Sequence, residues 1–125
     1  MDLNEYQELS RKTAIYPVLF MNDSKKPYAY YPEQNRMGFL YPALGLAGEA
    51  GEVLENIKRI IRDDEGRITP GRREKIKKEC GDTLWYLAQV AIEFNLSLTE
   101  IAEENLQKLN IRLKEGKIQG EGDNR

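Results

Sequence analysis

The chain has 125 residues, a net charge of −2, one cysteine (Cys80) and no histidine. This length suits a single domain, and the balance of 40% apolar to 32% charged residues excludes a disordered chain. The lone cysteine excludes an intrachain disulfide, and the lack of histidine excludes Ser-His-Asp and Cys-His catalysis as well as histidine zinc sites.

Hydrophobic periodicity predicts four helices and no strand of any length. The first helix is expected at residues 3–15, where it stops before Pro17 because proline cannot continue a helix. Residues 16–38 are expected to form an irregular, proline-interrupted loop. This loop is rich in tyrosine, with Tyr16, Tyr28, Tyr30 and Tyr31.

The other three helices follow one another closely. The second is expected at residues 39–63, and Thr69-Pro70 predicts the N-cap and first residue of the third, which continues to about residue 94. Ser97 and Glu100 form a capping box for the fourth helix, which is expected at about residues 98–113. We therefore expect one all-α domain over residues 1–125, an antiparallel helix bundle. Its functional helices would span residues 39–113 and its glycine-containing tail residues 114–125.

Two short acidic motifs stand on the second and third predicted helices: Glu49-Ala50-Gly51-Glu52 and Glu79-Cys80-Gly81-Asp82. Residues three apart on a helix are surface neighbours, about 5–6 Å apart at Cβ, so each pair can present two carboxylates to one ion. Antiparallel packing of the two helices would bring all four acids together. Mg²⁺ prefers oxygen ligands and keeps waters and substrate phosphates in its shell, which suits hydrolysis of a phosphoanhydride.

Such acid pairs are also common on solvated helix faces, and two observations favour a site. On the third helix the acids fall in a gap between two apolar stripes, which predicts a cleft where a cation or partner compensates their charge. The second helix carries Gly45, Gly48 and Gly51, and the third carries Gly81, each costing roughly 1 kcal/mol relative to alanine. These glycines would permit tight helix packing, or leave room for metal, water or phosphate.

The fourth helix carries a polar row about 90° from its apolar stripe, made of Asn105, Lys108 and Arg112. This row is either a solvated face or a phosphate-binding row beside the carboxylates. Lys58 on the second helix has the same two interpretations.

Two runs, at residues 44–53 and 79–87, resemble the MazG-like nucleotide pyrophosphohydrolases, whose pattern is ExxE, a spacer, then ExxD. The segment Asn105-Leu106-Gln107-Lys108-Leu109, followed by Arg112, is similar to the fourth helix of that family. Residues 120–125 resemble the tail of short single-domain members, including phage and bacterial ones.

The resemblance implies an all-α NTP pyrophosphatase fold, assembled as homodimers or homotetramers, that converts a (d)NTP and water to a (d)NMP and pyrophosphate. It implies Mg²⁺, with Mn²⁺ as a substitute. The ligands and catalytic residues would be Glu49, Glu52, Glu79 and Asp82. One of these acids, or Glu55, would orient the attacking water. The substrate-binding residues would be Lys58, Asn105, Lys108, Arg112, Tyr16, Asp123 and Arg125.

Two alternatives remain open at this point. A dUTP or phosphoribosyl-ATP pyrophosphohydrolase of the same superfamily would share the acids. A non-catalytic helical interaction module would instead pair them with basic residues such as Lys75, Lys77 and Lys78. The weak net charge argues against nucleic acid as a partner, and no apolar run approaches the roughly 18 residues that span a membrane. The single cysteine and the lack of a signal-peptide pattern favour the cytoplasm of a bacterial cell or phage-infected host.

Overall fold

The computed structural model describes residues 1–16, 19–20 and 36–122, and helices dominate these ranges. Its elements are α1 (Leu3–Arg11), β1 (Leu19–Phe20), β2 (Arg36–Met37), α2 (Leu40–Asp63), α3 (Pro70–Glu93) and α4 (Leu98–Lys114). The predicted all-α class is confirmed, and α2, α3 and α4 begin and end within one residue of their predicted bounds. No helix in these ranges is both long enough and apolar enough to cross a bilayer.

Side-chain caps explain where α1, α3 and α4 begin. The Asp2 carboxylate accepts a hydrogen bond from the Glu5 amide at 2.8 Å. The Thr69 hydroxyl accepts from the Arg72 amide, with Pro70 in the first turn as predicted. Such caps satisfy backbone donors that have no partner within the helix.

Helix α1 ends at Arg11, four residues before the predicted end. After this point the Thr13 amide donates to the Ser10 carbonyl and the Ala14 amide to the Arg11 carbonyl, both at 3.1 Å. The hydroxyl of Thr13 also donates to the Ser10 carbonyl, at 2.8 Å. Short polar side chains that bond nearby carbonyls compete with helical hydrogen bonding, so the last turn tightens instead of continuing as α-helix.

The segment predicted as an irregular loop contains a small antiparallel ribbon. Leu19 pairs with Met37, and Phe20 pairs with Arg36. Strands of two residues are too short to show alternation in a sequence. Pro17, Tyr28, Tyr30 and Tyr31, on which the loop prediction rests, lie outside the described residues.

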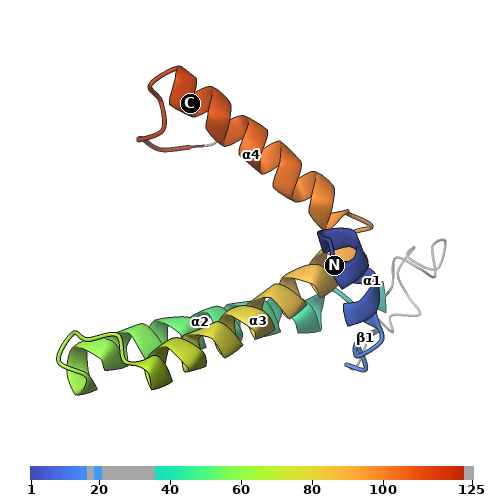
Figure 1. The fold of residues 1–125 in the computed structure, drawn as a ribbon. Coiled ribbons are helices and arrows are strands. Elements are labelled where there is room, and N and C mark those ends of the chain that lie inside the picture. Colours follow the sequence, from blue (N-terminus) through green and yellow to red (C-terminus); the bar gives the residue numbers. More distant parts are fainter. Residues whose placement is uncertain (17–18, 21–35, 123–125) are drawn as a thin grey trace.

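Figure 1 shows that α2 and α3 form a long antiparallel hairpin, while α4 leaves the end of α3 and projects away from it. Helix α1 lies across the junction and contacts both α3 and α4. The antiparallel pairing expected of a bundle therefore holds for α2 and α3. In a single chain α4 does not complete the predicted bundle.

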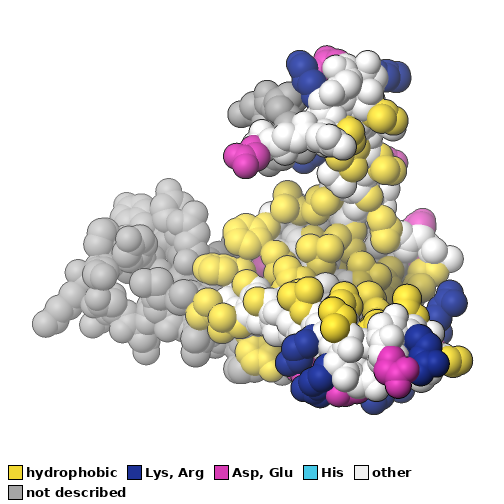
Figure 2. All heavy atoms as spheres, turned by 90° about the vertical axis from the view of Figure 1, so that its left-hand side faces the viewer, with side chains coloured by type: hydrophobic (Ala, Val, Ile, Leu, Met, Phe, Trp, Pro, Cys, Tyr) yellow, Lys and Arg dark blue, Asp and Glu magenta, His cyan; other side chains and the backbone are white. Residues whose placement is uncertain are grey.

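The core is small and lies where α1, α3 and α4 meet. Its buried apolar residues are Ala88, Ala91 and Leu98, with Tyr6 packed against them. Gln89, fully buried beside this core, donates to the Ser10 hydroxyl at 3.0 Å. Many large apolar side chains of α2 and α4 remain exposed. Figure 2 shows hydrophobic side chains gathered on the face of the hairpin that is turned toward α4.

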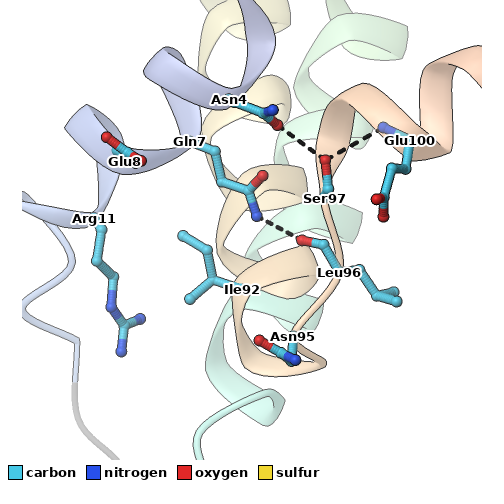
Figure 3. Close-up of a pocket in the computed structure, with 9 residues that line it drawn as sticks. All are labelled: Asn4, Gln7, Glu8, Arg11, Ile92, Asn95, Leu96, Ser97 and Glu100. Carbon is cyan, nitrogen blue, oxygen red and sulfur yellow. Dashed lines mark hydrogen bonds between the residues drawn. The ribbon is translucent and has the colours of Figure 1, made fainter.

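Hydrogen bonds from α1 hold the turn between α3 and α4 (Figure 3). The Gln7 side-chain amide donates to the Leu96 carbonyl at 2.7 Å, and its oxygen accepts from the Leu98 amide at 3.0 Å. The Ser97 hydroxyl, which caps α4, donates to the Asn4 side chain at 2.9 Å. Gln7 thus satisfies backbone groups on both sides of Ser97 and determines how α4 leaves α3.

Replacing Gln7 with alanine leaves the Leu96 carbonyl and the Leu98 amide without this partner. We expect Gln7→Ala to lower the free energy of unfolding by about 1–3 kcal/mol. Glu8→Ala, at an exposed neighbouring position, is the matched control and should change stability by less than about 0.5 kcal/mol. Urea denaturation followed by circular dichroism measures both, and equal stabilities would show that the Gln7 contacts contribute nothing.

Candidate metal centre

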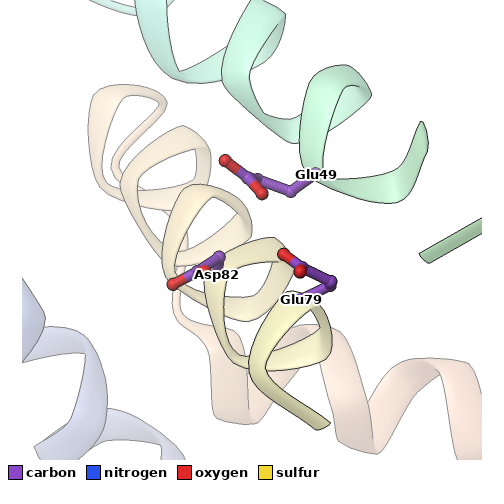
Figure 4. Close-up of side chains that lie close together, drawn as sticks. All are labelled: Glu49, Glu79 and Asp82. Carbon is purple, nitrogen blue, oxygen red and sulfur yellow. The ribbon is translucent and has the colours of Figure 1, made fainter. Parts of the chain in front are cut away.

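Three of the four predicted acids meet between α2 and α3. Glu49 on α2 and Glu79 and Asp82 on α3 each place one carboxylate oxygen within 4.8 Å of the other two. Figure 4 shows Glu49 reaching from one helix toward the two acids on the other. The i, i+3 spacing puts Glu79 and Asp82 side by side, and the antiparallel hairpin brings Glu49 opposite them. We call Glu49, Glu79 and Asp82 the acidic trio.

Glu52 is a neighbour of the acidic trio and not a member of it. Its side chain is exposed, and its backbone carbonyl accepts a hydrogen bond from the Asn56 side chain at 3.0 Å. Glu52 lies one turn beyond Glu49 on the same helix. The ExxE spacing alone could not show which of its two acids reaches the acids of α3.

Like charges dominate the electrostatics of the trio. Partial burial, followed by the charges of Asp82, Glu79 and Glu52, raises the pKa of Glu49 above its ordinary value. Within the described ranges, no lysine or arginine forms an ion pair with any of the three acids. Among the basic residues nearest in sequence to the motifs, the ammonium of Lys77 contacts Glu74. The arrangement concentrates negative charge that a divalent cation would neutralise.

The cleft predicted around the acids is open. Glu49 and Glu79 are half-buried and Asp82 is exposed, because parts of the apolar stripes of α3, including Leu84 and Leu87, remain uncovered in a single chain. The glycines of α2 and α3 differ in what surrounds them. At Gly48, Gly51 and Gly81 an added Cβ would meet nothing within 4 Å, so helix packing does not require glycine at these positions.

An aromatic cluster adjoins the acidic trio. The ring of Tyr86 packs directly on Gly45 of α2, and its hydroxyl lies near Tyr41. Trp85 meets Tyr86 edge to face at 4.9 Å between ring centroids. Burial first, and then the charges of Tyr41 and Glu49, raise the pKa of the Tyr86 hydroxyl, which places this group within electrostatic reach of the trio. Sequence reasoning gave Tyr86, Trp85 and Tyr41 no role, although the spacing placed Tyr86 on the same face as Asp82.

Tyr16, predicted to contact substrate, belongs to the far side of this cluster. Its ring stacks on Tyr41 at 5.4 Å and meets Trp85 edge to face at 6.2 Å. Its hydroxyl donates to Glu93 at 2.8 Å, and Arg11 forms an ion pair with the same carboxylate at 3.1 Å. Tyr16 thus ties the end of α1 to α3 through Glu93.

The row of Asn105, Lys108 and Arg112 on α4 does not lie beside the acidic trio of the same chain. Asn105 and Lys108 line an open pocket on α4, and Arg112 is buried on α4, where it donates to the Gly122 carbonyl at 3.4 Å. Because α4 projects away from the hairpin, this row is not beside the acids of its own chain, contrary to the expected arrangement. Lys58 forms an ion pair with Glu55. Asp123 and Arg125 lie outside the described residues.

The raised pKa of Glu49 makes stability depend on pH and cation in a defined direction. Without metal, the folded chain binds a proton at Glu49 more strongly than the unfolded chain does. The stability contributed by this group is therefore greatest below the ordinary glutamate pKa and is lost as pH rises through the raised pKa. Glu49→Gln removes the charge, so it should raise the free energy of unfolding at pH 7 in EDTA by roughly 0.5–1 kcal/mol.

The same variant should lose most of the stabilisation that Mg²⁺ gives to the unaltered protein, because binding to the folded state alone raises stability. Urea denaturation with EDTA and with Mg²⁺ measures both effects. Glu74→Gln, an exposed acid that is outside the trio, is the control. Glu49→Gln being less stable than the unaltered protein in EDTA would contradict this account of the charges.

Comparison with known proteins agrees with the geometry. A family model described as the MazG nucleotide pyrophosphohydrolase domain matches residues 41–116, which hold nearly all of α2 and the whole of α3 and α4. The chain is also similar to the Gene 37 protein of Mycobacterium phage L5, at 39% identity over 125 residues and the full length of both chains. No solved structure matches it. The chain therefore belongs to the MazG nucleotide pyrophosphohydrolase family.

Proposed function

We propose that this protein is a magnesium-dependent pyrophosphohydrolase that converts a nucleoside triphosphate, ribo or deoxy, and water to the nucleoside monophosphate and pyrophosphate. One observation carries the proposal: the acidic trio gathers three carboxylate oxygens within 4.8 Å, with no lysine or arginine paired to them in the described ranges. Membership of the MazG family supports the reaction class.

The residues present fit a hard divalent cation. Glu49, Glu79 and Asp82 offer only carboxylate oxygens, which Mg²⁺ and Mn²⁺ accept as ligands. Because Asp82 is exposed, waters and phosphates, which Mg²⁺ retains in its shell, can reach the site. Such an ion, when bound, polarises a phosphoryl oxygen and lowers the pKa of a coordinated water.

The position of Glu52 suits a different task from that of the trio. It lies one turn beyond Glu49, is exposed, and has no ion-pair partner in the described part of the chain. Glu55 contacts both Lys58 and Arg59, and hydrogen bonding to Lys58 lowers the pKa of the Glu55 carboxyl. Between Glu52 and Glu55, Glu52 is therefore better placed to accept a proton from the attacking water.

The exposed apolar surface supports a homodimer or homotetramer. On α4, Leu106 and Leu113 are 60% and 64% exposed, and on α2 Leu54 and Ile61 are 66% and 73% exposed. Contiguous apolar surface of this kind marks an interface more often than a free face. In the assembly we propose, a second copy covers the hairpin. The substrate-binding residues of α4 (Asn105, Lys108 and Arg112) then act at the acids of a neighbouring copy, with Asp123, Arg125, Tyr16 and Lys58 as further contributors.

The enzymatic proposal predicts a cation-dependent activity that requires the trio. Asp82→Asn and Glu79→Gln should each lower kcat/KM by at least about 100-fold, because each removes a ligand charge. Glu74→Gln, on the same helix but outside the trio, should retain activity within about twofold. The measurement is pyrophosphate and monophosphate release from a panel of canonical and modified nucleotides, with Mg²⁺, with Mn²⁺ and with EDTA.

The same panel separates the remaining alternatives. A strong preference for dUTP, or for phosphoribosyl-ATP, would assign the chain to one of those activities of the superfamily. Activity on no nucleotide, together with changed stability of Asp82→Asn, would favour a non-catalytic interaction module. The lack of ion pairs between the trio and Lys75, Lys77 or Lys78 disfavours the module, since its acids would need partners.

The oligomer proposal predicts that charge on the apolar stripe of α4 disrupts assembly. Leu106→Glu should convert the oligomer to a smaller species at micromolar concentration, because an unpaired carboxylate would be buried at the interface. Gln107→Glu adds the same charge outside the stripe and should leave the assembly unchanged. Size-exclusion chromatography with light scattering measures the mass, and identical masses for both variants would contradict the proposed interface.

A further inference from the structure

The two helices of the acidic site are in tight contact at Gly45 and Tyr86. A Cβ atom on Gly45 would fall well inside van der Waals contact with three ring atoms of Tyr86. Of the glycines on α2 and α3, Gly48, Gly51, Gly71 and Gly81 have open space at the same position. The backbone of α2 therefore rests on an aromatic ring of α3 at one defined point.

Neighbouring side chains hold this ring in place. Trp85 meets it edge to face at 4.9 Å, with the ring planes at 88°. Tyr41 lies near the Tyr86 hydroxyl and stacks on Tyr16 at 5.4 Å. A ring packed between Trp85 and the backbone of α2 cannot swing aside at low cost, so it acts as a rigid spacer between the two helices.

The contact lies one helical turn from the acidic trio on both helices. Gly45 precedes Glu49 by four residues, and Tyr86 follows Asp82 by four. Residues four apart lie on one face of a helix, so Gly45 and Glu49 share a face of α2, as Asp82 and Tyr86 share a face of α3. Because helices are stiff over one turn, the distance between Gly45 and Tyr86 determines the distance between Glu49 and Asp82.

We propose that Tyr86 is a positioning residue, whose ring, seated on Gly45, determines the distance between Glu49 and the acids of α3. This inference rests on the proposed metal-dependent function. A metal site tolerates displacements of only about 0.5 Å in its ligands, and Mg²⁺ demands near-ideal geometry. A methyl group inserted at Gly45 exceeds that tolerance unless the ring moves.

The test is the Mn²⁺ and Mg²⁺ affinity of the full chain without nucleotide, measured by isothermal titration calorimetry. Gly45→Ala should weaken binding by at least about tenfold, the range found when supporting residues of metal sites are altered. Gly48→Ala, where the added Cβ meets open space, should bind within about threefold of the unaltered protein. Alanine favours helix over glycine, so circular dichroism should show full helix content in both variants.

Two variants of Tyr86 keep the test decisive. Tyr86→Phe retains the ring and should keep the affinity, whereas Gly45→Ala combined with Tyr86→Leu makes room for the methyl group and should recover it to within about threefold. Loss of affinity in Tyr86→Phe equal to that in Gly45→Ala would assign the effect to the hydroxyl and overturn the spacer. Equal affinity of Gly45→Ala and the unaltered protein would also overturn it. No cation binding by the unaltered protein would instead overturn the proposed function.

Discussion

The repulsion among three carboxylates shapes this molecule. Glu49, Glu79 and Asp82 place oxygens within 4.8 Å of one another, and no basic side chain in the described ranges pairs with them. At such distances two like charges repel by about 1 kcal/mol in bulk water and by several kcal/mol near a protein surface. The fold opposes that repulsion when no cation is bound, and a divalent ion would convert it to attraction. Burial, followed by this repulsion from the neighbouring acids, raises the pKa of Glu49.

Contacts on both sides of the trio hold the hairpin together against this repulsion. Toward the turn, Arg72 donates to the side chain of buried Asn56 at 3.1 Å and forms an ion pair with Asp64 at 2.8 Å. Toward the open end, Tyr86 packs on Gly45. The acids lie between an ion-pair network and an aromatic spacer, so their spacing follows from packing that they do not themselves supply. Preorganisation of this kind lets a site bind an ion without rearranging the backbone.

Capping residues in the sequence predicted the helix starts, which depend only on residues within one turn. Thr69-Pro70 and the Ser97 cap predicted the starts of α3 and α4, because caps act within one turn. Periodicity could not predict where α4 points, because that direction depends on Gln7, distant in sequence, bonding to the turn. Spacing predicted four acids together, whereas helix packing brings three of them within 4.8 Å of one another. The glycine repeat indicated close approach at several positions, and contact with Tyr86 occurs at Gly45.

The chain has a small core, exposed apolar surface on α2 and α4, and an open acidic trio. In the assembly we propose, contact with copies of itself buries the apolar surface and completes the substrate site. The most direct test of the central claim is a crystal structure with Mn²⁺ and a non-hydrolysable triphosphate analogue, with the metal located by anomalous scattering. We predict an anomalous peak bridged by oxygens of Glu49, Glu79 and Asp82 and by the phosphates. A Mn²⁺ ion bound elsewhere, with the three carboxylates solvated and apart, would contradict the account.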